Sequence, residues 1–339
     1  MTIKALGIDL AKNVFQLHGV DGIGTPVLRR RVLRAQLPEV VAQIEPCIIG
    51  IEACTSAYFW AERFERFGHT VRIISPQYVK PFRLSQKNDT NDAQAICTAL
   101  QQPNMRFVPR RSAEQQDIQA LHRARQRLVN HRTALASQIR GFLRDRGLVF
   151  PRNIGQLRRT VPQILEDAEN GLTISARATI AELFDFLREV DRRVTVFDSR
   201  IDEAFRASSL AQRIARIEAG VGPKISTAVV AAVGDGRDFK NGRHMAAWLG
   251  LVPRQHSSGD RTQLFGISKR GDQHLRTLIV HGARAVVRTA ARKTDPKSCW
   301  ANQLRERRGF NRAVVAVANK NARVIWAVLR REEPYRRVA

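Results

Sequence analysis

Apolar residues recur at alternating spacings of three and four over residues 180–204, and this repeat constrains the fold of the chain more than any other feature. The repeating positions are Ile180, Leu183, Leu187, Val190, Val194, Phe197, Ile201 and Ala204. A seam that persists for more than three heptads is typical of a coiled-coil helix. It can close on another helix of the same chain or on a second chain, and periodicity does not choose between them. The length of the insertion favours oligomerisation.

A second long amphipathic helix is predicted upstream of this seam. It begins at residue 112 with the capping-box pattern of Ser112 and Gln115. Its apolar positions are Ile118, Leu121, Leu128, Leu135, Ile139 and Phe142. Proline and glycine residues predict a break near 151–171 between the two helices. We therefore assign residues 112–208 to a helical coiled-coil domain for oligomerisation.

Residues 1–111 carry strand signals followed by alternating strand and helix signals. The predicted strands cover 3–10, 13–20, 26–33, 47–53 and 69–75, and the first three form an antiparallel meander. The predicted helices cover about 37–45 and 57–68, and a third opens near Thr90 after a loop bracketed by Pro76 and Pro81. This order predicts an α/β sheet of the ribonuclease H type.

Four acidic residues stand at the ends of these elements. Asp9 ends the first strand, Glu52 ends the strand at 47–53, and Asp89 and Asp92 share one face of a helical first turn. If the two strands are neighbours, all four carboxylates can meet around Mg²⁺, which prefers oxygen ligands. Two such ions can act on a phosphodiester. The alternative is that one aspartate caps the helix and the second, in its first turn, is stabilised by the helix dipole.

Residues 209–339 are predicted to be mainly helical, and two of their segments suggest contacts with phosphate. Residues 217–235 have the form of a helix-hairpin-helix, in which Gly220, Gly222 and Lys224 could face a phosphate. An ordinary turn between helices is the alternative. Further on, Ser257, Ser258 and Gly259 lie in a polar loop, PRQHSSGDRTQ.

A serine hydroxyl in this loop could attack DNA if cations held the phosphate. The candidate cations are Arg254, Arg261, Lys269, Arg270 and Arg276. The alternative is that the Ser-Gly pair is only a turn. No base is assigned to activate the serine, although His256 is close in sequence.

The charge of the chain indicates a polyanionic partner. It has 57 Lys and Arg against 31 Asp and Glu, a formal charge of +26. Residues 254–339 alone carry 20 basic and 6 acidic groups. The four cysteines form no CxxC pair, so a structural zinc site has little support. No run of some 18 apolar residues and no secretion signal is present, so we expect a cytoplasmic, nucleoid-associated protein without membrane contact.

Two blocks of the sequence resemble a known family. Asp9 in GIDLAK, Glu52 in IGIEACT and the block KNDTNDAQAI resemble the DEDD motif of the insertion-sequence transposases of family one-hundred-ten, which are relatives of the Piv-type DNA invertases. The stretch MAAWLGLVPRQHSSGDRTQLFGISKRGDQHLRTLIVHGARAV resembles their C-terminal transposase domain. The resemblance spans nearly the whole chain and includes the long helical insertion of one subgroup.

The resemblance implies a RuvC-like domain over residues 1–111, a coiled-coil insertion over 112–208 and a transposase domain over 209–339. It implies Mg²⁺ ligands at Asp9, Glu52, Asp89 and Asp92, and a nucleophile at Ser258. It further implies dimers or tetramers that bind donor and target DNA, guided by a bridge RNA whose backbone the basic surface would grip. The doubled serine and the acidic Asp260 beside it depart from the expected pattern.

Three functions are compatible with these features. The first is a Mg²⁺-dependent, RNA-guided recombinase that moves an insertion sequence through a serine–DNA ester. The second is a RuvC-like nuclease or resolvase in which Ser258 is only a turn residue. The third is a nucleic-acid-binding assembly protein without catalysis. Loss of a covalent adduct in Ser258→Ala separates the first two, and replacement of Asp9 or Asp92 separates both from the third.

Overall fold

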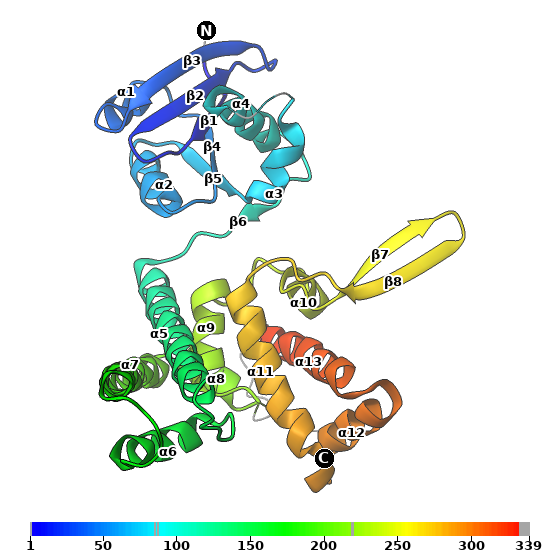
Figure 1. The fold of residues 1–339 in the computed structure, drawn as a ribbon. Coiled ribbons are helices and arrows are strands. Elements are labelled where there is room, and N and C mark those ends of the chain that lie inside the picture. The colour runs from blue at the N-terminus through cyan, green and yellow to red at the C-terminus, as the bar shows by residue number, and fades with distance from the viewer. Residues whose placement is uncertain (1, 85, 87, 218–219, 332–339) are drawn as a thin grey trace. The chain divides into compact units, whose positions relative to one another are not determined.

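The computed structural model describes residues 2–84, 86, 88–217 and 220–331. The chain divides into two compact units, residues 1–111 and residues 112–339, called here the first and the second unit (Figure 1). The first is a mixed α/β unit and the second is mostly helical, as predicted. No helix among the described residues is long and apolar enough to cross a membrane.

A six-stranded sheet forms the centre of the first unit. Its strands are β1 (Ala5–Asp9), β2 (Val14–Val20), β3 (Pro26–Leu33), β4 (Ile48–Glu52), β5 (Thr70–Ile74) and β6 (Phe107–Val108). They lie in the order β3-β2-β1-β4-β5-β6, with β1, β4 and β5 parallel and the other pairings antiparallel. The predicted meander and both later strands are confirmed. The two-residue β6 was not predicted, because so short a strand has no periodicity.

Helices cover both faces of this sheet. They are α1 (Leu37–Ala42), α2 (Ala57–Glu65), α3 (Pro76–Val79), the 3₁₀ turn η1 (Lys80–Phe82) and α4 (Asp89–Leu100). Helix α4 lies against β1 and β2, and α2 packs on β4 and β5 (Figure 1). The expected loop between the two prolines is instead α3 and η1. Pro76 is the first residue of α3 and Pro81 the second of η1, and the fixed φ of proline suits a first helical turn.

Alternation along the strands separates two faces of the sheet. Leu6, Ile8, Ile49 and Ile51 are fully buried in one core with Trp60 of α2. The residues between them face the other way. On that face a smaller core holds Ala5 together with residues of α4. The acidic strand ends that follow Ile8 and Ile51 therefore belong to the α4 face.

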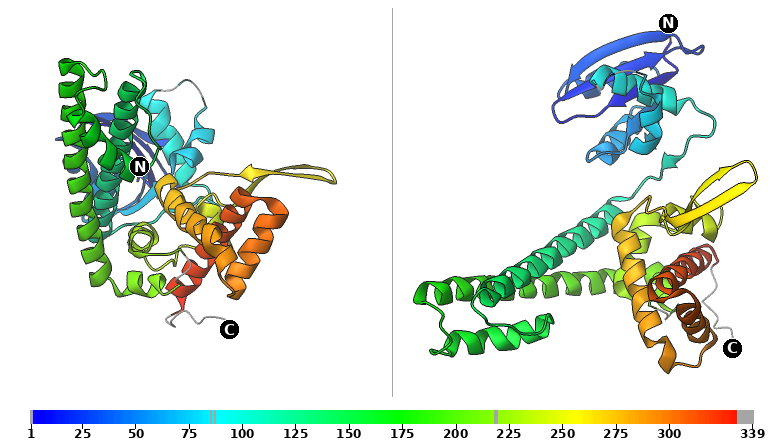
Figure 2. Two further views of the ribbon diagram at one scale, coloured as in Figure 1. Left: turned by 60° about the horizontal axis from the view of Figure 1, so that its bottom comes forward. Right: turned by 45° about the vertical axis from the view of Figure 1, so that its right-hand side comes forward.

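The second unit opens with three helices, α5 (Ala113–Arg144), α6 (Ile154–Glu166) and α7 (Ile174–Ala207). The capping box at Ser112 is present. The seam of α7 is buried against α5 and α6 of the same chain, and α5 and α7 run side by side (Figure 2). Of the two alternatives for closing the seam, the structure shows closure within the chain.

Helix α6 lies where the sequence predicted only a break. Its Pro162 lacks an N–H and sits inside the helix. The helix persists because Leu157 and Val161 are fully buried in the core shared with α5 and α7. Burial of two large apolar side chains contributes roughly 3 to 6 kcal/mol, which is enough to offset the cost of about 3 kcal/mol for an internal proline.

The rest of the second unit packs around a second core. Its elements are α8 (Ser209–Ala215), α9 (Pro223–Val233), α10 (Gly242–Trp248), the strands β7 (Pro253–Ser258) and β8 (Arg261–Ile267), α11 (Gln273–Thr289), the turn η2 (Ala290–Arg292), α12 (Pro296–Arg308) and α13 (Phe310–Arg330). Helix α13 contributes the most to this core and contacts α10, α11 and α12. Helices α5 and α7 both contact α9. A domain boundary near residue 208 stays a prediction.

Candidate active site

Asp9 and Glu52 end two strands that are parallel neighbours. The register pairs Gly7 with Gly50 and Ile8 with Ile51, so the next step brings Asp9 level with Glu52. Both residues are half-buried. The predicted adjacency of the two strands is therefore present, and both carboxylates leave the sheet on its α4 face.

Helix α4 approaches this face unusually closely because the strands carry glycine there. A Cβ on Gly7 would lie 2.6 Å from the backbone nitrogen of Cys97, and one on Gly50 would lie 3.1 Å from Leu100 Cδ2. The Cys97 thiol donates to the carbonyl of Ala5, whereas Ala93 lies over Gly7. The helix thus runs antiparallel to β1. Its first turn, with Asp89 and Asp92, points toward the end of β1 that carries Asp9.

Neither aspartate is the N-cap of this helix, so the prediction that one of them caps it is wrong. Both lie in its first turn. The N-cap is Asn88, whose side chain accepts a hydrogen bond of 2.8 Å from the backbone N–H of Asn91. Asp89 is exposed at the first helical position, and Asp92 is only 8% exposed. A buried carboxylate is costly unless it has a cationic or hydrogen-bonding partner.

The partner of Asp92 is Arg83, which the sequence reasoning missed. Arg83 Nε lies 2.6 Å from Asp92 Oδ1. Neither of these buried atoms makes a well-directed hydrogen bond, so the contact is an ion pair rather than a bidentate fork. Arg83 follows η1 and lies six positions before the first residue of α4. A signal was available in retrospect, since Arg83 stands close before the DxxD block.

The donor atoms of these residues suit a hard divalent cation. All four are carboxylates, and Asp92 is already held beside a positive charge. Among the described residues, no group of three or more acidic, histidine or cysteine side chains is close enough to hold a metal. The structure thus brings Asp9, Glu52 and the start of α4 to one end of the sheet, but does not draw their oxygens into a ligand cluster.

Replacement of Arg83 provides a test of its role as counter-ion. In Arg83→Gln the buried Asp92 carboxylate loses its positive neighbour, and the free energy of unfolding should fall by about 2 kcal/mol in EDTA. Added Mg²⁺ should raise the melting temperature more in this variant than in the wild type, because Arg83 no longer competes with the ion for the Asp92 carboxylate. Thermal melts with EDTA and with Mg²⁺ measure both effects. Arg30→Gln, at an exposed position on β3, is the control and should show neither.

The serine pair lies in a β-hairpin, not in the predicted loop. Strands β7 and β8 pair antiparallel and are joined by Gly259 and Asp260, with Gly259 at φ 54° as a type II′ turn requires. Ser258 stands opposite Arg261 at the tip. The hydroxyl of Ser257 accepts a hydrogen bond of 2.7 Å from Gln255 Nε2. Because neighbouring residues of a strand alternate in direction, Ser258 faces the opposite side of the ribbon.

Of the five cations expected around Ser258, only Arg261 is brought to it. Strand β7 rises about 3.3 Å per residue, which places Ser258 roughly 17 Å from Pro253 at the base of the hairpin. Arg254 lies beside that base, and Lys269 and Arg270 follow the hairpin in a loop. The Arg276 guanidinium donates to the carbonyls of Leu249 and Arg270 and so stabilises this loop.

Comparison with known proteins identifies the family. A profile of DEDD transposases matches residues 6–146, and one described as "Transposase IS116/IS110/IS902 family" matches residues 211–297. A probable family 20 transposase of Pseudomonas aeruginosa is 46% identical over 337 residues, 99% of each chain. The chain belongs to this transposase family. The transposase for element IS1111A of Coxiella burnetii is 46% identical over 98% of this chain and 92% of its own. The transposase for element IS1328 of Yersinia enterocolitica is 36% identical over 96% of both.

These matches confirm the family predicted from the two motif blocks, and they make the protein a DNA transposase. A DEDD transposase domain implies dependence on a divalent metal ion, typically Mg²⁺. The acidic end of the sheet in the first unit lies within the matched DEDD region, and the hairpin with Ser258 lies within the second matched region.

The transposase uses the glycines of the predicted helix-hairpin-helix in two ways. Gly220, at φ 71°, lies so close to Gly282 of α11 that a Cβ at either position would collide with the carbonyl of the other. Gly220 therefore serves packing between the turn and α11. Gly222 caps α9, and a Cβ there would meet open space. Residues 218 and 219 of the predicted helix-hairpin-helix, which precede its turn, lie outside the described residues.

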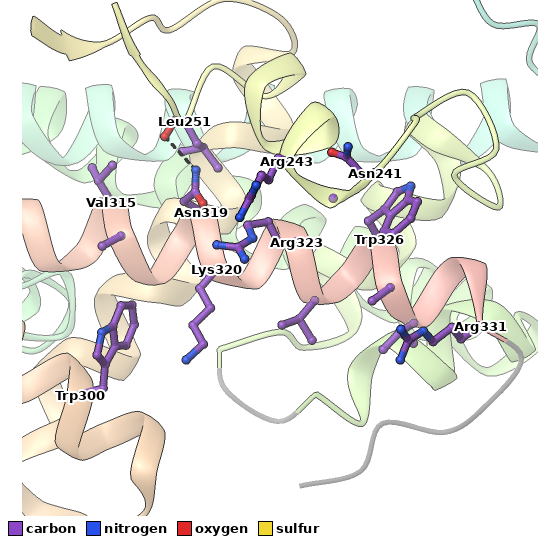
Figure 3. A pocket seen from close by; sticks show the side chains of 15 residues that line it. Asn241, Arg243, Leu251, Trp300, Val315, Asn319, Lys320, Arg323, Trp326 and Arg331 are labelled. Atoms are coloured by element: carbon purple, nitrogen blue, oxygen red, sulfur yellow. Dashed lines mark hydrogen bonds between the residues drawn. The ribbon is translucent and has the colours of Figure 1, made fainter. Parts of the chain in front are cut away.

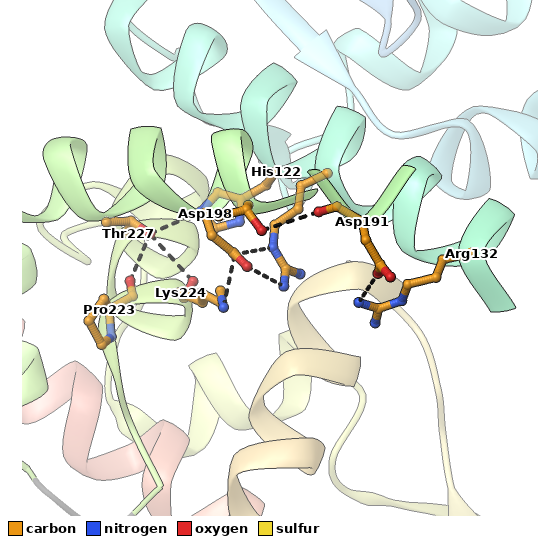
Figure 4. A network of polar contacts seen from close by, with 9 residues as sticks. His122, Arg132, Asp191, Asp198, Pro223, Lys224 and Thr227 are labelled. Carbon is orange, nitrogen blue, oxygen red and sulfur yellow. Dashed lines mark hydrogen bonds and ion pairs between the residues drawn. The ribbon is translucent and has the colours of Figure 1, made fainter. Parts of the chain in front are cut away.

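Lys224 belongs to a polar network that joins α9 to the long helices (Figure 4). Its Nζ lies 2.9 Å from Asp198 Oδ1 on α7, and Arg125 Nε of α5 lies 2.5 Å from the same oxygen. Burial raises the pKa of Asp198, but the hydrogen bonds from Arg125 and Lys224 outweigh this effect, so the pKa lies below its ordinary value. Lys224 is thus engaged within the protein while remaining partly exposed.

His122 of α5 lies in the same network and is almost fully buried. Its Nε2 is 2.9 Å from the hydroxyl oxygen of Thr227, and that hydroxyl donates to the carbonyl of Pro223. Burial, and then the positive charge of nearby groups beginning with His274, lower the pKa of His122 to about 4. Its imidazole is therefore neutral in the folded transposase at neutral pH.

This burial predicts loss of stability in acid. The unfolded chain binds a proton at His122 below an ordinary pKa of 6.5, whereas the folded chain does so only near 4. The contribution of the neutral His122 to the free energy of unfolding is thus fully present above pH 6.5. It is lost as the pH drops toward 4, and the loss amounts to about 2 kcal/mol at about pH 5. Urea titrations at several pH values should show that the free energy of unfolding of His122→Gln no longer falls in this way between pH 6.5 and 4. The variant His131→Gln, at an exposed position, should keep the slope of the free energy of unfolding against pH. An unchanged slope in His122→Gln would contradict the assignment.

Proposed function

We propose that this transposase cuts and rejoins DNA with the carboxylates of Asp9, Glu52, Asp89 and Asp92 and the hydroxyl of Ser258. The observation that carries the proposal is the register of β1 and β4, which sets Asp9 level with Glu52 beneath the start of α4. The strand order, with three antiparallel strands followed by parallel β4 and β5, supports a RuvC-like fold for the first unit. The metal ligands would be the same four carboxylates, around two Mg²⁺ ions.

The chain's own residues have separate tasks in this scheme. When bound, Mg²⁺ would supply positive charge beside the attacked phosphate and its leaving oxygen. Asp9 and Glu52 provide a rigid base for the site because both end strands of the central sheet. Asp89 and Asp92 complete it from α4. Arg83 keeps Asp92 compensated and oriented toward this end of the sheet.

Ser258 would form the covalent link to DNA. Its Oγ attacks a backbone phosphorus, an Oγ–P bond forms, and the bond from phosphorus to one sugar oxygen breaks. The serine gives up its proton and the released sugar hydroxyl gains one, so the step is balanced and needs no redox partner. Arg261, directly opposite Ser258 in the hairpin, is placed to stabilise charge on the phosphoryl group.

The partners follow from charge and from the family. The formal charge of +26 supports binding of donor and target DNA and of a bridge RNA that reads sequence by base pairing. Arg254, Lys269, Arg270 and the α9 end with Gly222 would hold backbone phosphates away from the serine. We further propose a cytoplasmic, nucleoid-associated dimer or tetramer.

The decisive experiment is capture of the covalent adduct. The purified transposase is incubated with end-labelled element DNA, its transcribed flanking RNA and Mg²⁺, then denatured and separated by gel electrophoresis. Wild type and Ser257→Ala should yield a labelled protein–DNA band that resists denaturation, and Ser258→Ala should yield none. Cleavage without any adduct in the wild type would favour a nuclease that uses water. An adduct that is lost only in Ser257→Ala would move the nucleophile by one residue.

A further inference from the structure

A groove in the second unit combines positive charge with aromatic rings. It has a volume of about 1190 Å³ and runs along α13, with the start of α10 on one side and Trp300 of α12 at one end (Figure 3). Its charged residues are Arg243, Lys320, Arg323 and Arg331. No acidic residue is among those described residues that line it.

Like charges converge on the middle of this groove. A Cβ on Gly242 would lie 2.9 Å from Arg323 Cα, so the backbones of α10 and α13 nearly touch there. Arg243, the next residue, and Arg323 are both exposed, and both side chains point into the groove (Figure 3). Two guanidinium groups held side by side without a lining carboxylate repel each other, and a bound anion would relieve that repulsion.

The end of the groove at Trp300 presents an indole ring and the ammonium group of Lys320. Lys320 Nζ lies 4.6 Å from the centre of the Trp300 ring, in a cation–π contact. Lys297, one turn before Trp300, donates to the Asn321 side chain at 2.8 Å. Burial, and then the charge of Lys320, lower the pKa of Lys297 to about 8. An approaching phosphate would therefore meet the exposed Lys320 ammonium group beside the indole ring, while Lys297 is engaged within the protein.

A second indole is fixed farther along the groove. Trp326 Nε1 donates to the carbonyls of Gly236 and Phe239, each at 3.2 Å, so one edge of its ring is anchored and cannot turn away. Aromatic rings spaced along a basic groove are typical of sites for single-stranded nucleic acid, because unpaired bases stack on rings while their phosphates contact the cations. Bases in a duplex are already stacked and cannot do this.

We infer that this groove binds an unpaired segment of nucleic acid, with a base stacked on the Trp300 ring in place of Lys320 and the phosphates held by Arg243, Arg323 and the displaced Lys320. The inference goes beyond the proposed chemistry, because it concerns none of the carboxylates or serines. A transposase that separates strands exposes unpaired DNA, and a folded RNA has unpaired loops, so either could supply the segment. The two sources share the same recognition and are distinguished by the test.

The test measures binding by fluorescence anisotropy. The probes are a labelled DNA strand of about ten nucleotides, within the site sizes of single-strand grooves, the RNA strand of the same sequence, and the blunt DNA duplex. Trp300→Leu should weaken binding of a single strand by roughly 5- to 100-fold and change duplex binding by less than about twofold. Whichever strand loses more affinity, DNA or RNA, identifies the source of the segment.

A milder variant guards against loss of folding. Lys320 is exposed, and Lys320→Gln should lower the slope of log Kd against log salt concentration by about 0.7 for single strands. Arg330→Gln, at an exposed position of α13 outside the groove lining, is the charge-matched control and should leave single-strand affinity within about twofold. Circular dichroism checks that each variant is folded.

Three results would overturn the inference. One is wild-type affinity for single strands in both Trp300→Leu and Lys320→Gln. Another is an equal loss for duplex and single strand, which would mean general attraction to phosphate. A third is a polyglutamate peptide that competes as well as the single strand, which would assign the groove to an acidic protein segment. Because Asp9, Asp92 and Ser258 stay intact in these variants, DNA cleavage measured in parallel tests the proposed chemistry separately.

Discussion

Asp92→Asn is expected to lower the rate of DNA strand cleavage by about 10³-fold, with DNA affinity changed by less than about twofold. The substitution keeps the shape of the side chain and removes its charge. A metal-assisted site loses several kcal/mol of transition-state stabilisation when a charged ligand is lost, and each 1.36 kcal/mol corresponds to a tenfold change in rate. Binding should hold because the basic surface, not this carboxylate, attracts the DNA.

Single-turnover cleavage of labelled element DNA measures this effect. Asp9→Asn should fall to a similar rate, since Asp9 stands level with Glu52 on the neighbouring strand. Glu45→Gln, at an exposed position between α1 and β4, is the control and should cleave at the wild-type rate. Near-normal cleavage by Asp92→Asn would mean that the Arg83–Asp92 pair is only structural and that the metal ligands lie elsewhere.

Much of the first unit could be predicted because its signals are local. Runs such as LGID and IGIE alternate between residues of two faces, and this alternation predicts both the strands and the side on which their final acids emerge. The sequence alone leaves the adjacency of these two strands open, and the strand order of the sheet shows it. That Asp9 stands level with Glu52 depends on the pairing register of β1 and β4, which the fold shows and the local pattern does not contain.

The hairpin with Ser258 could not be predicted in this way. All residues of β7 are exposed, and Leu264 and Phe265 of β8 are 63% and 41% exposed. Without a buried face, no apolar alternation marks the strands, and the polar sequence looks like a loop. An isolated two-stranded ribbon is at best marginally stable in water.

Long-range pairings were also beyond the reach of the sequence. The heptad seam of α7 predicts that some helix covers it. A helix of the same chain and a helix of a second chain satisfy this pattern equally well, and only the fold shows that α5 and α6 cover the seam. The pairing of Lys224 with Asp198 likewise depends on how α9 packs against α7. A lysine beside a glycine turn has the same sequence signature whether it binds phosphate or an internal carboxylate.

Gly7→Ala is expected to lower the free energy of unfolding by about 3 kcal/mol, at the upper end of the usual cost of overpacking. The added Cβ would lie 2.6 Å from the backbone nitrogen and 2.8 Å from the Cβ of Cys97, and closer still to the carbonyl oxygen of Ala93. These atoms belong to the body of α4, so the whole helix has to move away from β1. Urea denaturation of the transposase measures the loss.

The same displacement connects the fold to the chemistry. Asp89 and Asp92 travel with α4, whereas Asp9 and Glu52 stay with the sheet, so the variant separates the two halves of the carboxylate site without changing any carboxylate. A misplacement of about 1 Å can cost about 10²-fold in rate, and cleavage by folded Gly7→Ala should fall accordingly. Gly22→Ala is the control, because its nearest contact would be Lys4 Cγ at 3.9 Å. If Gly7→Ala were destabilised yet cleaved DNA normally, the position of α4 over β1 would not matter for catalysis, and the carboxylates would have to act from different sites.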